Sequence, residues 1–148
     1  MGYIDELGTA AKAAEREMTK IGTMQKNAAL RAVSEKLLSN KDVIIKENGR
    51  DIENARINGM SEAMIDRLTL TESRIDGISE GVLQVVALKD PIGEVIGGGE
   101  LPNGLRIIQK RVPLGVIGII FESRPNVTVD AAALCLKSGN VCILRGGS

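Results

Sequence analysis

The chain has 148 residues, of which 43% are hydrophobic and 26% are charged, a composition typical of a globular protein and too apolar for a disordered one. Lysines and arginines number 19, as do aspartates and glutamates, so there is no net charge to attract nucleic acid or an anionic membrane surface. The absence of histidine excludes Ser-His-Asp and Cys-His catalysis, and most zinc sites, from this segment.

The sequence carries no recognisable signal for secretion or membrane insertion. Its longest apolar stretch, residues 112–121, is about half as long as a bilayer-spanning helix must be, and it contains Pro113. Acidic side chains occur near the amino terminus, where a signal peptide would be basic and then apolar. With two cysteines and no such signal, we expect a cytoplasmic protein that binds neither membrane nor nucleic acid.

Residues 1–89 are predicted to be helical. Apolar residues recur at intervals of three and four, which places them on one face of each helix. We interpret these stripes as helix faces packed on a core. They run through residues 4–18, 30–38, 44–55 and 75–86. Residues suited to helix ends separate the stripes, and Thr69 and Glu72 have the spacing of a capping box.

Residues 90–112 change to turn formers and strand-like segments, which predicts a hairpin-like unit. Asn103-Gly104 is a hairpin-turn signal. The run Gly97-Gly98-Gly99 precedes no helix, so it lacks the context that a phosphate-binding loop requires. We interpret these three glycines as turn residues.

Residues 113–148 are predicted to form a strand, a helix and a second strand. Segments 115–121 and 141–144 are almost entirely apolar, as in strands buried on both faces of a parallel sheet. Residues 127–137 between them have helical character. This order is a right-handed βαβ unit, on which nucleotide-binding sheets are built. Because no helix follows the second strand to cover the sheet, we expect a truncated domain.

Both apolar strands are followed by residues suited to ligand binding, at the sheet edge where open α/β sheets bind ligands. Arg145 can donate charge-assisted bonds to phosphate or ribose oxygens. The bare backbone of Gly146 and Gly147 would let a phosphate approach closely, although a plain turn would use the same residues. Asn126 is either the cap of the following helix or an amide donor that faces a ligand oxygen.

The two cysteines are predicted to serve packing. Cys135 lies among apolar residues of the predicted helix, and Cys142 lies in a predicted buried strand. Both environments disfavour the thiolate that nucleophilic or metal chemistry needs. We therefore expect neither a metal site nor a catalytic residue among them.

The stretch KRVPLGVIGIIFESRPNVTVDAAALCLKSGNVCILRGGS resembles the start of the nucleotide-binding domain in the gamma-glutamyl phosphate reductase family of the aldehyde dehydrogenase superfamily. The upstream segments GMSEAMIDRLTLTESRI and DPIGEVIGGGELPNGLRIIQKR are also similar to that family, so the resemblance covers the whole chain. It implies an aldehyde dehydrogenase-like α/β fold, with amino-terminal helices and the start of a parallel nucleotide-binding sheet. Residues 1–148 would be the amino-terminal part of the NADP-binding domain, without the catalytic domain.

The resemblance also implies a reaction. The family reduces L-glutamyl 5-phosphate to L-glutamate 5-semialdehyde with NADPH and releases phosphate, in proline biosynthesis. A cysteine thiolate displaces the phosphate to give a thioester, which hydride from NADPH then reduces to the aldehyde level. That cysteine is expected beyond residue 148, because neither Cys135 nor Cys142 matches it. A homo-oligomer and a functional link to glutamate 5-kinase are implied as well.

The resemblance assigns cofactor contacts to both strand exits. Arg145 matches a lysine that contacts the adenine ribose in the wider superfamily, and Ser148 matches a ribose-binding Glu of NAD-preferring relatives. Ser in place of Glu, beside Arg145, favours the 2′-phosphate of NADP(H). The oxyanion-hole Asn of the superfamily falls near Asn126, where this stretch departs from the common pattern. The implied cofactor-binding residues are Phe121, Glu122, Ser123, Arg124, Arg145, Gly146, Gly147 and Ser148.

Two alternatives stay open at this stage. The chain could be a non-catalytic nucleotide-binding or interaction module, which a longer reading frame with a downstream cysteine would contradict. It could also belong to another acyl-phosphate or aldehyde dehydrogenase of the superfamily. Comparing glutamyl phosphate with other acyl phosphates as substrates would separate these two enzymes.

Overall fold

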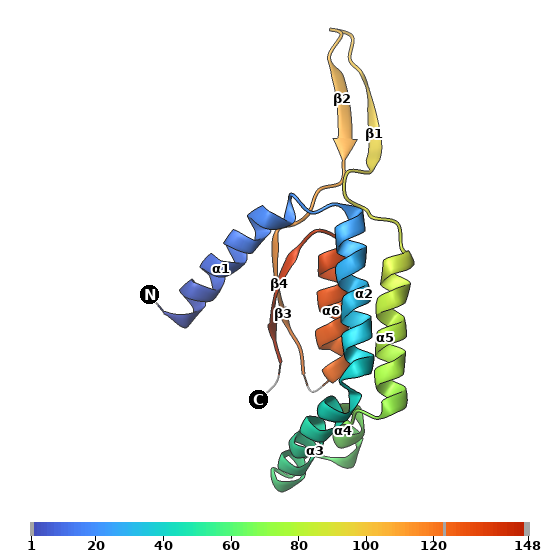
Figure 1. The fold of residues 1–148 in the computed structure, drawn as a ribbon. Coiled ribbons are helices and arrows are strands. Elements are labelled where there is room, and N and C mark those ends of the chain that lie inside the picture. The colour runs from blue at the N-terminus through green and yellow to red at the C-terminus, as the bar shows by residue number, and fades with distance from the viewer. Residues whose placement is uncertain (1, 123, 147–148) are drawn as a thin grey trace.

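The computed structural model describes residues 2–122 and 124–146, which form a layer of helices, a parallel strand pair and a projecting hairpin (Figure 1). The helices occupy most of the first 87 residues, and one more helix joins the two parallel strands. The elements in chain order are α1 (Tyr3–Met18), α2 (Thr23–Ser39), α3 (Lys41–Ile57), α4 (Glu62–Leu68), α5 (Glu72–Ala87), β1 (Val95–Glu100), β2 (Arg106–Lys110), β3 (Val116–Ile120), α6 (Pro125–Lys137) and β4 (Val141–Arg145).

The core lies where α2, α5 and α6 pack together. Leu30 and Val82, both from predicted apolar stripes, are 1% exposed and form its centre with Val86 and Ala133. Near this centre, the buried hydroxyls of Ser34 on α2 and Ser79 on α5 lie 2.7 Å apart and hydrogen-bond to each other. The stripes on α2 and α5 therefore do mark the faces that pack, as the sequence predicts.

The first predicted stripe is only partly buried. On α1, Ala11 is buried whereas Ile4 is 73% exposed, because the helix runs outward from the body toward its amino terminus (Figure 1). Its inner part contacts β3 and β4 on the sheet face opposite α6.

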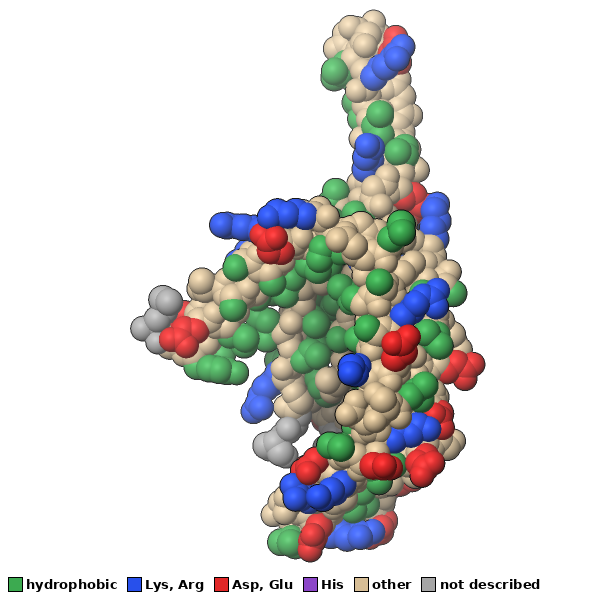
Figure 2. Space-filling view, in the orientation of Figure 1, with side chains coloured by type: hydrophobic (Ala, Val, Ile, Leu, Met, Phe, Trp, Pro, Cys, Tyr) green, Lys and Arg blue, Asp and Glu red, His purple; other side chains and the backbone are tan. Residues whose placement is uncertain are grey.

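The strands of the βαβ unit are parallel, which confirms the predicted fold class. The sequence predicted strands buried on both faces, which is wrong. The helix layer covers one face, and the inner part of α1 covers part of the other. Ile120 at the end of β3 is 86% exposed. Figure 2 shows apolar side chains gathered in the hollow between α1 and the helix layer.

The hairpin of β1 and β2 differs from its prediction in one respect. Gly97, Gly98 and Gly99 lie within strand β1 and pair with β2, rather than in a turn. A Cβ atom at Gly98 would clash with the carbonyl oxygen of Ile107, so the close approach of the two strands requires glycine there. The turn itself contains Gly104 at a φ of +83°, a conformation that favours glycine, as the Asn-Gly signal predicts.

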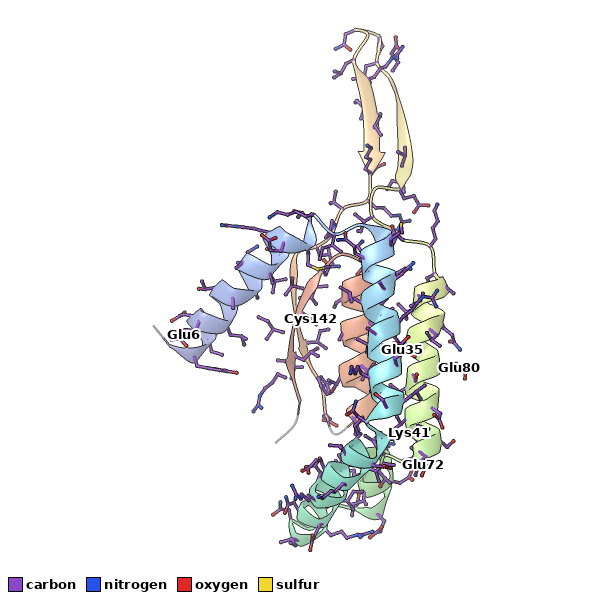
Figure 3. The ribbon with its side chains drawn as sticks, in the orientation of Figure 1. Glu6, Glu35, Lys41, Glu72, Glu80 and Cys142 are labelled. Carbon is purple, nitrogen blue, oxygen red and sulfur yellow. The ribbon has the colours of Figure 1, made fainter. Side chains whose placement is uncertain are left out.

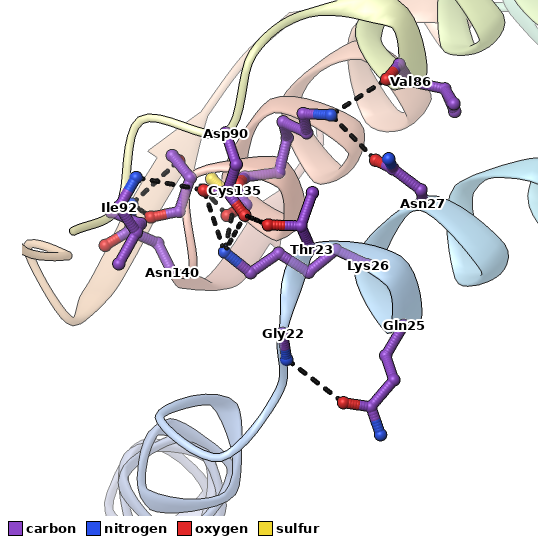
Figure 4. Close-up of polar contacts among 12 residues, drawn as sticks. Gly22, Thr23, Gln25, Lys26, Asn27, Val86, Asp90, Ile92, Cys135 and Asn140 are labelled. Atoms are coloured by element: carbon purple, nitrogen blue, oxygen red, sulfur yellow. Dashed lines mark hydrogen bonds and ion pairs between the residues drawn. The ribbon is translucent and has the colours of Figure 1, made fainter. Parts of the chain in front are cut away.

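A buried polar junction holds the base of the hairpin against the helices (Figure 4). Lys26 of α2 is 3% exposed, and its Nζ atom lies 2.9 Å from Oδ2 of Asp90, in the linker between α5 and β1. Thr23 donates to the same carboxylate at 2.7 Å. Burial alone would raise the pKa of Asp90, but hydrogen bonds from the Ile92 amide, Lys26 and Thr23 outweigh it and leave that pKa below its ordinary value.

A second lysine is buried beside this junction. Lys137, also 3% exposed, donates from Nζ to Oδ1 of Asn27 at 2.7 Å and to the carbonyl oxygen of Val86 at 2.9 Å. The carbonyl oxygen of Lys137 in turn accepts a hydrogen bond from Nζ of Lys26. Neither buried lysine follows from sequence reasoning, because lysine is rarely buried without a specific partner.

Candidate functional site

The carboxyl ends of β3 and β4 lie side by side. Ile120 pairs with Arg145 in the parallel register, and the amide nitrogen of Phe121 donates to the carbonyl oxygen of Arg145 at 3.0 Å. The residues that leave the two strands therefore share one edge of the sheet. This edge lies at the end of the molecule where α3 and α4 are found (Figure 1).

Four of the predicted cofactor residues meet at this edge, which we call the strand-exit shelf and define as Phe121, Glu122, Arg145 and Gly146. The side chain of Arg145 is exposed, and Phe121 is half-buried next to Gly146. A Cβ atom at Gly146 would meet the Phe121 ring at 3.7 Å, an ordinary contact, so packing among the described residues does not demand glycine. A ligand that approaches the backbone would explain it. Ser123, Gly147 and Ser148 lie outside the described residues.

The exit from β3 leads directly into α6. Arg124 is the N-cap residue of that helix, with extended backbone and no side-chain cap, and Pro125 occupies the first turn. The amide nitrogen of Arg124 donates to the carbonyl oxygen of Glu122 at 2.6 Å. The helix thus begins two residues earlier than predicted, because proline is well suited to a first helical turn.

Asn126 does not cap α6, which excludes one of the two roles left open for it. It lies inside the first turn, and its side-chain amide donates to Oδ2 of Asp130 at 3.1 Å. Both side chains are exposed and line a hollow. A role toward a ligand stays a prediction for Asn126.

The hollow lies between the α4–α5 turn and the start of α6, and we call it the arginine pocket. Its volume is about 450 Å³. Three arginines line it, Arg67 of α4, Arg74 of α5 and Arg124, the N-cap residue of α6. The remaining lining residues are Asp66, Thr69, Leu70, Gly77, Ile78, Pro125, Asn126 and Asp130.

Sequence reasoning missed this pocket, since Arg124 lies far along the chain from Arg67 and Arg74. In the same region it interpreted Thr69 and Glu72 as a capping box. That interpretation also misplaced one cap. Thr71, not Thr69, is the N-cap of α5, and its hydroxyl accepts from the Arg74 amide at 3.2 Å. The hydroxyl of Thr69 instead donates to the carbonyl oxygen of Ile65, which ends α4.

The cysteines lie away from the shelf. Cys142 pairs with Ile117 near the opposite end of the strands, and it is labelled on β4 in Figure 3. Burial raises the pKa of the Cys135 thiol, and the neighbouring Cys142 thiol raises it further. A raised pKa leaves less thiolate at neutral pH, so Cys135 is unsuited to nucleophilic attack.

The described part of the chain offers neither a metal site nor a membrane-spanning helix. Within it, no three acidic, cysteine or histidine residues cluster closely enough to hold a metal ion. None of its helices combines the length and apolar character needed to span a bilayer.

Curated relatives match nearly the whole chain, although no model of a known protein family does. A gamma-glutamyl phosphate reductase of Clostridium novyi is 54% identical over 146 residues, which is 99% of this chain and 35% of the relative. One from Escherichia coli is 50% identical over 97% of this chain and 34% of its own length. The chain therefore spans about a third of the length of these relatives.

Solved structures agree with the sequence matches. The gamma-glutamyl phosphate reductase of Thermotoga maritima superposes with a TM-score of 0.94 at 43% identity, over 99% of this chain and 35% of that one. The Saccharomyces cerevisiae protein of the same name gives 0.94 at 32% identity, over 100% and 38%. A probable aldehyde dehydrogenase from Listeria monocytogenes, 16% identical over 97% of this chain and 29% of that one, shares the fold with a TM-score of 0.66.

Proposed function

We propose that the chain is the amino-terminal part of a gamma-glutamyl phosphate reductase, an enzyme that reduces L-glutamyl 5-phosphate to L-glutamate 5-semialdehyde, because relatives of that name are 50% and 54% identical to it over nearly its whole length. NADPH supplies the hydride, and phosphate is released. In this proposal the complete protein carries the activity, and residues 1–148 contribute to its NADP-binding domain. We assign this reaction to proline biosynthesis and place the enzyme in the cytoplasm.

The observation that supports cofactor binding most strongly is the adjacency of the two strand exits. A dinucleotide lying across the carboxyl edge of a parallel sheet would meet Arg145 and Gly146 from one strand and Phe121 and Glu122 from the other. The exposed guanidinium of Arg145 would bind the 2′-phosphate that distinguishes NADP(H) from NAD(H). The bare backbone of Gly146 would leave room for the nucleotide.

The nucleophile of the reaction lies outside residues 1–148 in this proposal. Cys135 is buried with a raised pKa, and Cys142 is at the end of its strand remote from the shelf. Residues 1–148 would then bind and orient the cofactor, while another segment attacks the acyl phosphate. A homo-oligomer and a functional link to glutamate 5-kinase are further parts of the proposal, to be tested by sedimentation and by pull-down of the complete protein.

The reverse reaction provides the test. The complete protein is expected to form NADPH from L-glutamate 5-semialdehyde, phosphate and NADP, and to do so far more slowly with other aldehydes. The 148-residue chain alone is expected to form none. Clear turnover by the chain alone would contradict the placement of the nucleophile, and a complete protein that prefers another aldehyde would contradict the proposed substrate.

A further inference from the structure

We propose that the arginine pocket binds the amino-acid end of the substrate, with the α-carboxylate held by Arg67 and Arg124 and the α-ammonium held by Asp130. The inference rests on the proposed function, because it concerns which part of glutamyl phosphate each charge recognises. It adds specificity-determining residues to the site. It assigns them no part in the chemical step.

One of the three arginines in the pocket is committed to the fold. The guanidinium of Arg74 donates to the carbonyl oxygens of Asp66 and Thr69, the latter at 2.8 Å, and to Oδ1 of Asp66 at 2.9 Å. These bonds tie the end of α4 to the start of α5 and fix the turn that forms one wall of the pocket. Arg74 and Asp66 also neutralise each other.

The charges that remain match an amino acid. Among the described residues, Arg67, Arg124 and Asp130 take part in no ion pair. All three are exposed, so they are hydrated and ready to exchange water for a ligand. Two guanidinium groups and one carboxylate complement an α-carboxylate beside an α-ammonium group. A plain anion such as phosphate would be repelled by Asp130, which makes the zwitterion the better fit.

Asp130 is oriented by a neighbour. The side-chain amide of Asn126 donates to its Oδ2 at 3.1 Å, which leaves Oδ1 available to accept from an ammonium group. The two residues lie one turn apart on α6, at positions i and i+4, so the helix itself sets their spacing. This gives Asn126 a positioning role beside the amino group.

The pocket continues toward the shelf. Arg67 and Arg124 also line a smaller hollow together with Met64 and Glu122. Glu122 directly follows Phe121, whose amide is bonded across the strand exits to Arg145. A substrate whose charged end occupies the arginine pocket would therefore extend its acyl end toward the edge where we place the cofactor.

The first arm of the test measures the KM of the complete enzyme, because the nucleophile is proposed to lie outside residues 1–148. Arg67→Gln is expected to raise the KM for L-glutamate 5-semialdehyde about tenfold and to leave kcat nearly unchanged, since a charge-assisted bond to a part of the substrate remote from the reaction is lost. Arg56→Gln, an exposed arginine of α3 outside the pocket, is the matched control and should leave KM unchanged.

The second arm measures discrimination. The wild-type enzyme should favour L-glutamate 5-semialdehyde over 5-oxopentanoate, which lacks only the amino group. Asp130→Asn removes the charge but keeps an acceptor for Asn126, so this preference should fall about tenfold through loss of activity on the natural aldehyde. Unchanged NADPH affinity in each variant would show that the fold is intact.

The possible outcomes distinguish a failure of the proposed function from a failure of the pocket assignment. If the wild-type enzyme does not act on L-glutamate 5-semialdehyde, the proposed function itself fails. If it does, but both variants retain wild-type KM and preference, the function stands and the pocket assignment is overturned. A rise in the KM for phosphate alone would also overturn it, because the arginines would then hold the leaving group.

Discussion

The helical body and the projecting hairpin are ordered by different interactions. In the body, Leu30 and Val82 are 1% exposed and the helices interlock around them. In the hairpin, every residue of β2 is exposed, and Ile108 is 63% exposed. Two strands alone are marginally stable in water, so backbone bonds and the junction at its base must hold the hairpin in place. The site residues lie on the body, where packing keeps them fixed.

The largest expected effect on stability comes from a substitution in the core of the helical body. Leu30→Ala should lower the free energy of unfolding by about 4 kcal/mol, because it leaves a cavity at the centre of the helix layer. Ile108→Ala in the hairpin is the contrasting variant and should change it by no more than about 0.5 kcal/mol. Urea denaturation of the chain compares them. Equal losses of unfolding free energy would contradict this contrast, because Ile108 would then contribute to the core as Leu30 does.

The next effect tests the junction between the two regions. Asp90→Asn leaves the buried ammonium of Lys26 without its counter-charge and should cost about 3 kcal/mol. Glu94, which pairs with Lys89 and Arg111 near the protein surface, offers a control: Glu94→Gln should cost much less than Asp90→Asn. Similar costs for the two substitutions would refute the role given to the junction.

The lowered pKa of Asp90 also predicts how the stability of the chain depends on pH. The pKa of Asp90 is lowered in the folded chain, so its contribution to stability is present above the ordinary aspartate range and is lost as the pH falls through the lowered value. The stability difference between wild type and Asp90→Asn should therefore be full at pH 7 and shrink in strong acid. A difference that stays constant down to pH 2 would contradict this assignment.

The smallest expected effect on overall stability comes from a substitution that disturbs the hairpin alone. Gly98→Ala places a Cβ atom against the carbonyl oxygen of Ile107, so the strands must separate locally. Hydrogen exchange should show faster exchange of β1 and β2 amides and unchanged protection in α2 and α5. Gly99→Ala is the control, since a Cβ atom there has no close neighbour.

The contrast also shows what the sequence could predict. Apolar periodicity identified the faces of α2 and α5, and the runs rich in Val and Ile identified the parallel strands whose exits meet. These patterns succeed because burial of one face leaves a local record in the residue order. The exits adjoin because a short βαβ unit permits one arrangement of its strands.

The features that were missed depend on contacts between distant segments. Gly97, Gly98 and Gly99 form a strand because the partner strand approaches closely, which composition alone does not reveal. Lys26 is buried because Asp90 meets it from 64 residues away. The arginine pocket unites Arg67 of α4, Arg74 of α5 and Arg124 at the N-cap of α6, and each of them taken alone has the appearance of an ordinary surface arginine.

The central claim is that the strand-exit shelf binds NADP(H), and direct titration tests it. The chain should bind NADPH more tightly than NADH, and Arg145→Gln should weaken NADPH binding about tenfold while NADH binding stays the same. Arg56→Gln should change neither. If Arg145→Gln binds NADPH as the wild type does, or if the two nucleotides bind equally, Arg145 does not recognise the 2′-phosphate and the cofactor assignment at the shelf fails.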